Sequence, residues 1–211
     1  MRPDDPAGIG GGARGGGGST GLLSSPLGLI VAANIIVFVI QYFGGVGQRV
    51  ITENGIAFLP GGSVSREGLF KRGEVWTLFT YMFVHGGVLH ILLNMLMIVV
   101  CGRMVVRLVG NRHFLWIYFT SGVAGALLQM VFSPVPLVGA SACAFGLLVA
   151  LGAIIPQQEM RMLLYFVLPI RLRMKTLALG LVIVSALFFL IDLAAGPGAV
   201  SYTHLTLPTI C

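Results

Sequence analysis

Long runs of apolar residues, separated by short polar turns, constrain this chain more than any other feature of its sequence. A helix needs about 20 apolar residues to cross a bilayer. Charged residues make up only 9% of the chain, against about 25% in a soluble domain. So little charge cannot cover a surface that faces water. We therefore expect an all-α, polytopic membrane protein with five spanning helices, at about 27–43, 88–106, 114–132, 138–155 and 176–193.

The basic residues indicate orientation and not a nucleic-acid partner. The net charge is +6, but the arginines and lysines lie in short turns between apolar runs and form no single stripe with aromatic residues. With the N-terminus in the cytoplasm, nine basic residues fall on the cytoplasmic side and four outside. The positive-inside rule therefore predicts a multi-pass protein with a cytoplasmic N-terminus. A bacterial inner (plasma) membrane fits this pattern.

The chain divides into segments of different composition. Residues 1–21 are rich in glycine and lack the apolar core of a signal peptide, so we expect a disordered tail. Residues 22–199 hold the apolar runs and form the expected transmembrane domain. The loop at 44–75 is about thirty residues long and ends in charges beside Trp76, which marks a membrane interface.

Two polar clusters inside the apolar runs are candidates for chemistry, because polar groups in a membrane are costly. His90 and Asn94 are four residues apart and share one face of a helix, with His85 about one turn earlier. They can donate hydrogen bonds into a cavity, or they can simply join neighbouring helices. From spacing alone, neither interpretation is favoured.

Ser141 lies among small residues, directly after a proline-rich break at 133–136. Its position near a helix N-terminus would expose it to water and to the positive end of the helix dipole. A serine that bonds back to its own helix is the commoner case, so Ser141 alone is a weak signal. A serine nucleophile with donors such as His90 and Asn94 would carry out acyl transfer at membrane level.

The cysteines give no sign of a metal or disulfide site. Cys101 and Cys143 lie within apolar runs, and Cys211 is the last residue. None has metal-like spacing, so we expect small buried apolar residues, with no metal and no cofactor.

Over residues 70–195 the sequence resembles the rhomboid family of intramembrane serine proteases. The resemblance rests on Gly-Glu-Val-Trp at 73–76, on the His85, His90 and Asn94 cluster, and on Gly-Ala-Ser-Ala at 139–142. It implies a six-helix bundle with a water-filled active site that opens outward. It also implies a Ser–His dyad with Ser141 as nucleophile, and an oxyanion hole formed partly by His90 and Asn94.

Further family properties follow from the same resemblance. Phe145 matches an aromatic position that packs near the catalytic histidine. Substrates would be transmembrane proteins cleaved at or near the bilayer, without metal or cofactor. Two positions differ from many members: Thr77 stands where an arginine usually follows the tryptophan, and Ala142 where a glycine usually follows the nucleophile.

The family's catalytic histidine lies on a sixth helix, and no sixth apolar run follows residue 199. His204 has only seven residues after it and lies among threonines and a proline, so we do not expect it to be the base. Val200 through Thr209 resemble one reading frame of a sequencing-library adapter, and we expect a non-native tail at 200–211. The chain as written is therefore expected to be a catalytically incomplete fragment of a serine endopeptidase.

Two alternatives from other classes stay open. A rhomboid-like protein without catalysis would bind transmembrane segments and release them uncut. An unrelated transporter or scaffold would use His90, Asn94 and Ser141 only to join helices. The sequence does not indicate the oligomeric state.

Overall fold

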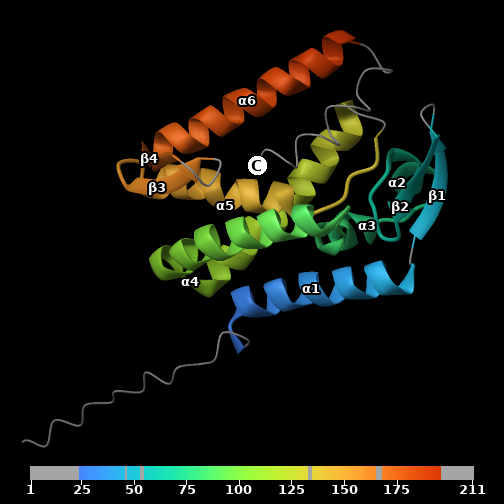
Figure 1. Cartoon of the computed structure of the whole chain (residues 1–211), viewed down its shortest axis with the longest axis horizontal. Coiled ribbons are helices and arrows are strands. Elements are labelled where there is room, and N and C mark those ends of the chain that lie inside the picture. Colours follow the sequence, from blue (N-terminus) through green and yellow to red (C-terminus); the bar gives the residue numbers. More distant parts are fainter. Residues whose placement is uncertain (1–23, 46, 53–54, 133–134, 165–167, 196–211) are drawn as a thin grey trace, which may run out of the picture.

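The computed structural model describes residues 24–45, 47–52, 55–132, 135–164 and 168–195 (Figure 1). The described chain is mostly helical. Its long helices are α1 (Pro26–Gly44), α4 (Val88–Phe132), α5 (Ser141–Ile154) and α6 (Met174–Ala195). The predicted tails at 1–21 and 200–211, with His204 and Cys211, lie outside the described residues.

Helix α1 shows how the local sequence sets helix ends. The Ser25 hydroxyl accepts a hydrogen bond from the Gly28 N–H at 3.1 Å, and Pro26 occupies the first turn, where its missing N–H costs nothing. The helix stops at Gly45, which has a left-handed φ of 60°. These limits agree with the predicted run at 27–43.

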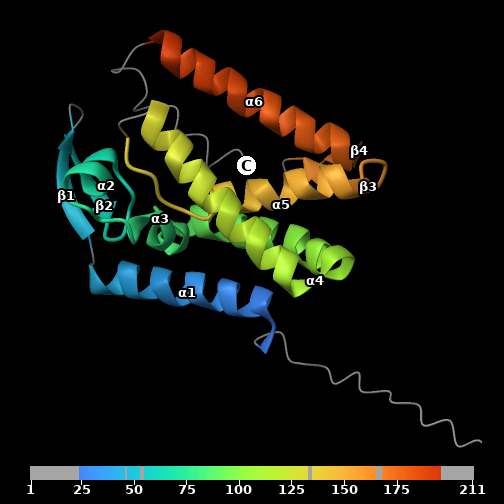
Figure 2. The same ribbon diagram turned by 180° about the vertical axis from the view of Figure 1, so that it is seen from behind.

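Helix α4 contains two of the predicted spans, joined without a loop. It breaks at Gly110, where φ is 83° and ψ is 169°. The half before Gly110 runs away from the His90 cluster, and the half after it turns back (Figures 1 and 2). Contacts confirm the return, because Tyr81 Oη donates to the Gly122 carbonyl at 2.6 Å.

The described chain is mostly helical, as expected, and two short antiparallel β-hairpins add to the helices. β1 (Gly47–Thr52) pairs with β2 (Gly55–Pro60), and β3 (Glu159–Leu164) pairs with β4 (Leu168–Arg173). Both hairpins lie between predicted spans, where strand pairing satisfies backbone groups that no helix can reach. The long first loop continues through α2 (Arg66–Lys71), α3 (Thr77–Thr80) and the short 3₁₀ helix η2 (Tyr81–Phe83).

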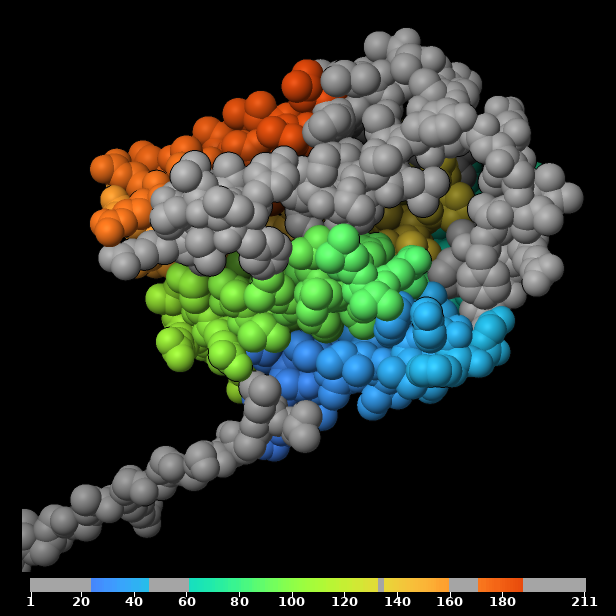
Figure 3. Space-filling view, viewed as in Figure 1, coloured from blue at the N-terminus to red at the C-terminus, as the bar shows by residue number. Residues whose placement is uncertain are grey.

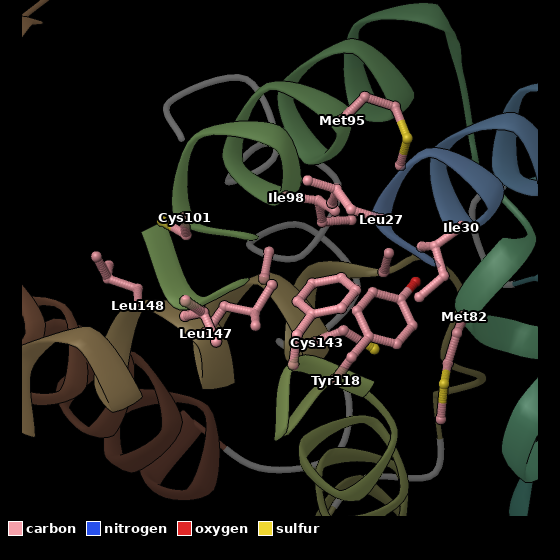
Figure 4. Packing of buried hydrophobic residues seen from close by; sticks show 14 of the residues in the cluster. Leu27, Ile30, Met82, Met95, Ile98, Cys101, Tyr118, Cys143, Leu147 and Leu148 are labelled. Atoms are coloured by element: carbon pink, nitrogen blue, oxygen red, sulfur yellow. The ribbon is translucent and has the colours of Figure 1, made fainter. Parts of the chain in front are cut away.

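The core forms where the two halves of α4 meet α1, η2 and α5. Residues from all of these elements converge there, including Tyr118, Cys143, Met82, Ile30 and Leu147 (Figure 4). Small residues allow close approach between helices: a Cβ added at Gly125 would lie 2.6 Å from the Ala142 Cβ. Helix α1 packs alongside α4 (Figure 3).

Successive turns of the chain lie at alternating ends of the helix bundle. The loop-1 end holds the first loop, the start and finish of α4, and the start of α5. The opposite end holds the start of α1, the Gly110 break, the finish of α5, the β3–β4 hairpin and the start of α6. Direct contacts define this second end: Leu27 lies against Gly102, and the Lys175 N–H donates to the Pro156 carbonyl at 3.2 Å.

Among the described residues, α1 and α4 are long and apolar enough to cross a membrane. Ser141–Ile154 and Met174–Leu187 are shorter apolar helices. Since α4 is broken at Gly110, it accounts for two of the predicted spans. The count of five spans, and a sixth outside the sequence, stay predictions.

Candidate active site

His90 and Asn94 lie on the first turns of α4 and face the same way, as their spacing predicts. Asn94 is buried and His90 is half-buried. One N–H of the Asn94 amide donates to the His90 carbonyl at 3.0 Å, which holds the side chain against its own helix. The amide keeps a second N–H for another acceptor.

The His90 ring has a defined hydrogen-bonding state. Its Nδ1 accepts a hydrogen bond from the Gly86 N–H at 3.3 Å. A neutral imidazole that accepts at Nδ1 carries its proton on Nε2. The Nε2–H of His90 is therefore a donor on the other side of the ring.

Gly139 lies directly against that donor. Its φ is 105°, and a Cβ built on it would lie 2.7 Å from both Cε1 and Nε2 of His90 and 3.7 Å from Asn94 Nδ2. The structure therefore brings together the two clusters that the sequence singled out separately. The backbone just before Ser141 passes beside two potential hydrogen-bond donors.

Ser141 is the first residue of α5, and its side chain is exposed. Ala140, at the N-cap, makes no side-chain hydrogen bond to the helix. The first N–H groups of α5 have no acceptor inside the helix, so they present partial positive charge beside the Ser141 hydroxyl. An anion that forms next to Ser141 would lie beside these N–H groups.

The first loop fixes the segment that leads to Ser141, and the sequence did not reveal this. Val64 and Leu137 form a β-bridge through two backbone hydrogen bonds of 3.1 and 2.8 Å, and the Gly139 N–H donates to the Tyr81 carbonyl at 2.9 Å. Isolated backbone pairs of this kind leave no periodic pattern to find.

Arg66 adds a second tie between the first loop and the bundle. Its guanidinium donates from Nε to the Met130 carbonyl at 2.8 Å and from Nη2 to the Val131 carbonyl at 2.9 Å. These carbonyls belong to the last turn of α4, where they lack helical partners and carry partial negative charge. The sequence indicates Arg66 only as an orientation signal, because nothing near it in the chain predicts a helix cap.

His85 is fully buried in the turn before α4, with its ring edge-on to the His90 ring at a centroid distance of 5.1 Å. Gln41 of α1 bonds both backbone groups of His85, at 2.6 and 3.2 Å. Burial, and then the neighbouring His90, lower the pKa of His85 to about 4. A pocket of about 240 Å³ lies between α1 and this turn, lined in part by Gln41 and His85.

Phe145 is half-buried on α5, one turn after Ser141, and its role beside a catalytic histidine stays a prediction. Cys101 and Cys143 are buried and free, as expected for small apolar residues. The described residues contain no group of three side chains able to hold a metal ion, and the expected absence of metal and cofactor stays a prediction.

Sequence comparison with known proteins identifies the family of this chain. Residues 72–206 match the family model described as the Rhomboid domain. The chain is 35% identical to the Rhomboid protease GluP of Bacillus subtilis, over 58% of this chain and 23% of that protein. It is 30% identical to Rhomboid-like protease 3 of Toxoplasma gondii, over 59% of this chain and 46% of that protein.

A third relative is the Inactive RHOMBOID-like protein 8 of Arabidopsis thaliana, 29% identical over 43% of this chain and 26% of that protein. The chain thus spans less than half the length of the relatives it matches. The family model covers most of the chain, from the charged end of the first loop through α6. The chain therefore belongs to the rhomboid family, whose members include integral membrane proteases.

Proposed function

We propose that the complete protein is an intramembrane serine endopeptidase in which Ser141 is the nucleophile and His90 and Asn94 help to form the oxyanion hole. The close approach of the Gly139 backbone to His90 and Asn94 carries this proposal. It puts two hydrogen-bond donors beside the segment that holds an exposed serine at a helix N-terminus. Donors fixed before charge develops are the main requirement for stabilising an oxyanion.

The reaction would follow ordinary serine chemistry. A histidine base on a sixth helix takes the proton of Ser141 Oγ, which attacks the scissile carbonyl carbon. The oxyanion accepts hydrogen bonds from His90 Nε2–H, the Asn94 amide and the Ser141 backbone N–H. The base then protonates the leaving amine, and water hydrolyses the acyl-enzyme.

The proposed substrates are transmembrane proteins, which reach the site from the bilayer. No cofactor or nucleic acid takes part. The proposed location of the protein is a bacterial inner membrane, with the N-terminus in the cytoplasm. Residues 1–211 alone are proposed to lack the base and to be inactive, because an unassisted Ser141 keeps its proton near neutral pH.

The second candidate is a rhomboid-like protein that binds transmembrane segments without cutting them. One relative of this chain carries the word inactive in its name. An intact Ser141 would then coexist with a sixth helix that lacks histidine. The two candidates differ in one measurable property, which is covalent reactivity of Ser141.

The test begins with a longer DNA read at the source locus, beyond codon 199. The completed protein is then reconstituted in liposomes with a transmembrane substrate and, separately, labelled with a fluorophosphonate. We expect cleavage and labelling in the natural protein and neither in Ser141→Ala. Ser121→Ala is the matched control, because its hydroxyl bonds only to its own helix, at the Ile117 and Tyr118 carbonyls.

Retained cleavage in Ser141→Ala would refute the nucleophile assignment. A completed chain with a sixth helix but no histidine, no labelling and retained binding of transmembrane peptides would establish the second candidate. If residues 1–211 cleave substrate without any extension, the proposed need for a sixth-helix base is wrong.

A further inference from the structure

Six cations gather at the end of the bundle opposite the candidate active site. Arg103 and Arg107 end the first half of α4, and Arg112 begins the second half, just across the Gly110 break. The remaining three belong to β4 and the first turn of α6, which pack at the same end of the bundle. They are Arg171, Arg173 and Lys175.

These six side chains are exposed and carry unbalanced charge. In the part of the chain that the structure describes, the only ion pair joins Arg72 and Glu74, at the loop-1 end. The exposed carboxylate at the cationic end is Glu159. At the loop-1 end, by contrast, Arg66 bonds helix carbonyls, Arg72 is paired, and the exposed Lys71 lies one helical turn after Glu67. The excess positive charge is therefore local to one end.

Exposed apolar residues beside these cations indicate how deep the cations would lie in a bilayer. Leu108 and Trp116 lie within about one helical turn of Arg107 and Arg112, and they are 46% and 62% exposed. Leu179, one turn after Lys175, is 60% exposed. A soluble polyanion would contact the charges but leave this apolar surface uncovered. A lipid offers a charged headgroup and an apolar chain at matching depths.

We propose that this cationic end binds the headgroups of anionic phospholipids in one leaflet of the bilayer. The planar guanidinium matches a phosphate with two parallel hydrogen bonds, and five of the six residues are arginines. Their long side chains extend from the helix ends to the headgroup layer.

The two tryptophans of the chain provide a reporter at each end. Trp116 lies one turn after Arg112, and Trp76 lies in the first loop at the other end; both are exposed. The Trp76→Phe variant keeps only Trp116, and Trp116→Phe keeps only Trp76. Each is reconstituted in phosphatidylcholine bilayers containing brominated phosphatidylglycerol. Quenching of the tryptophan fluorescence, compared with brominated phosphatidylcholine, gives the relative binding constant of the anionic lipid.

At low ionic strength we expect phosphatidylglycerol to bind near Trp116 about fivefold more tightly than phosphatidylcholine, the effect of about one cation at a membrane surface. The preference should fall at about 0.5 M salt, where screening is strong. Combined Arg107→Gln, Arg112→Gln and Arg173→Gln changes should bring the ratio close to one. Combined Lys71→Gln and Arg72→Gln changes at the other end are the matched control and should leave the Trp116 ratio unchanged.

Equal quenching by both lipids at Trp116 would overturn the proposal. So would the same preference at Trp76, because it would show a general attraction and not a site. If the triple variant fails to fold, the native chain in neutral micelles decides the matter. Its unfolding temperature should rise with added phosphatidylglycerol and not with phosphatidylcholine, and equal responses would again overturn the proposal.

Discussion

At Gly139 one backbone conformation brings the two halves of the candidate site together. The φ of 105° lies in a region that residues with a Cβ rarely adopt, and the missing Cβ leaves room for the His90 ring. Both the positive φ and the close approach of the His90 ring therefore favour glycine at this position. A sequence shows only that the residue is small, whereas the structure shows what it touches.

The Gly139→Ala variant should be strongly destabilised. Backbone strain and a collision with the His90 ring should together lower the free energy of unfolding by about 2 to 4 kcal/mol. Gly73→Ala is the matched control, because Gly73 has a φ of 69° but nothing within 4 Å of the added Cβ. We expect a loss of about 1 to 2 kcal/mol there. Thermal unfolding in detergent micelles measures the loss of stability in both variants. Equal losses would contradict the expected collision between the added Cβ and the His90 ring.

His85 illustrates a residue whose burial has a measurable consequence. Because its pKa is lowered to about 4, the folded protein keeps the ring neutral where an unfolded chain would bind a proton. Its contribution to stability is complete above pH 6.5 and is lost as the pH falls toward 4. The charged or titratable group that faces it is His90, and Gln41 holds its backbone.

We therefore expect the free energy of unfolding to fall between pH 6.5 and pH 4, with a slope from His85 of at most about 1.4 kcal/mol per pH unit. The His85→Gln variant should have a shallower slope in this window, whatever its absolute stability. His113→Gln removes an exposed imidazole and serves as the control. A slope unchanged by His85→Gln would show that other groups cause the acid sensitivity. Unfolding in micelles across pH gives these slopes.

At the scale of elements, the first loop acts as a structured strap across the bundle. Helix α2 begins at Arg66, whose side chain caps the last turn of α4, and Val64 pairs with the segment before α5. The loop thus holds two helix ends that flank the 135–140 connection. Loops of this length usually carry function or order of their own, and here the order comes from these few polar contacts.

Replacing Arg66 should loosen this strap. Arg66→Gln removes hydrogen bonds between a charged group and two helix carbonyls, and the loss should be about 1 to 3 kcal/mol in the free energy of unfolding. The expected change for Lys71→Gln is within about 0.5 kcal/mol, because Lys71 is an exposed residue at the other end of the same helix. Hydrogen exchange at the Val64 and Leu137 amides should rise in Arg66→Gln alone. Unchanged exchange would show that Arg66 does not hold the strap.

At the scale of the whole molecule, the chain places different chemistry at its two ends. The loop-1 end holds Ser141, His90 and Asn94, and the opposite end holds the exposed arginines. In a membrane protein, charge of this kind marks the side that stays in the cytoplasm. The two ends should therefore face opposite sides of one bilayer.

Cysteine labelling in bacterial cells tests this orientation. In a Cys211→Ser background, Lys71→Cys should react with a membrane-impermeant maleimide in intact cells, and Arg173→Cys should react only after permeabilisation. Cys101 and Cys143 are buried and should stay silent. Reaction of both introduced cysteines from the same side would refute the proposed topology.

The sequence by itself determined the membrane class, the helix limits and the identity of the polar residues. Apolar length and low charge leave few alternatives, so α1 and both halves of α4 fall close to the predicted runs. The spacing of His90 and Asn94 predicted that they share one face of a helix, because helix periodicity is local. The family followed from motif order along the chain.

Only the tertiary structure decided which distant groups meet. The contact of Gly139 with His90, the bond of Arg66 to the end of α4 and the pairing of Val64 with Leu137 join residues far apart in the chain. The two β-hairpins were not predicted either, because their strands show no clear alternation of apolar and polar residues. Long-range contacts leave no periodicity in a sequence, since they depend on how the helices pack and where the chain turns.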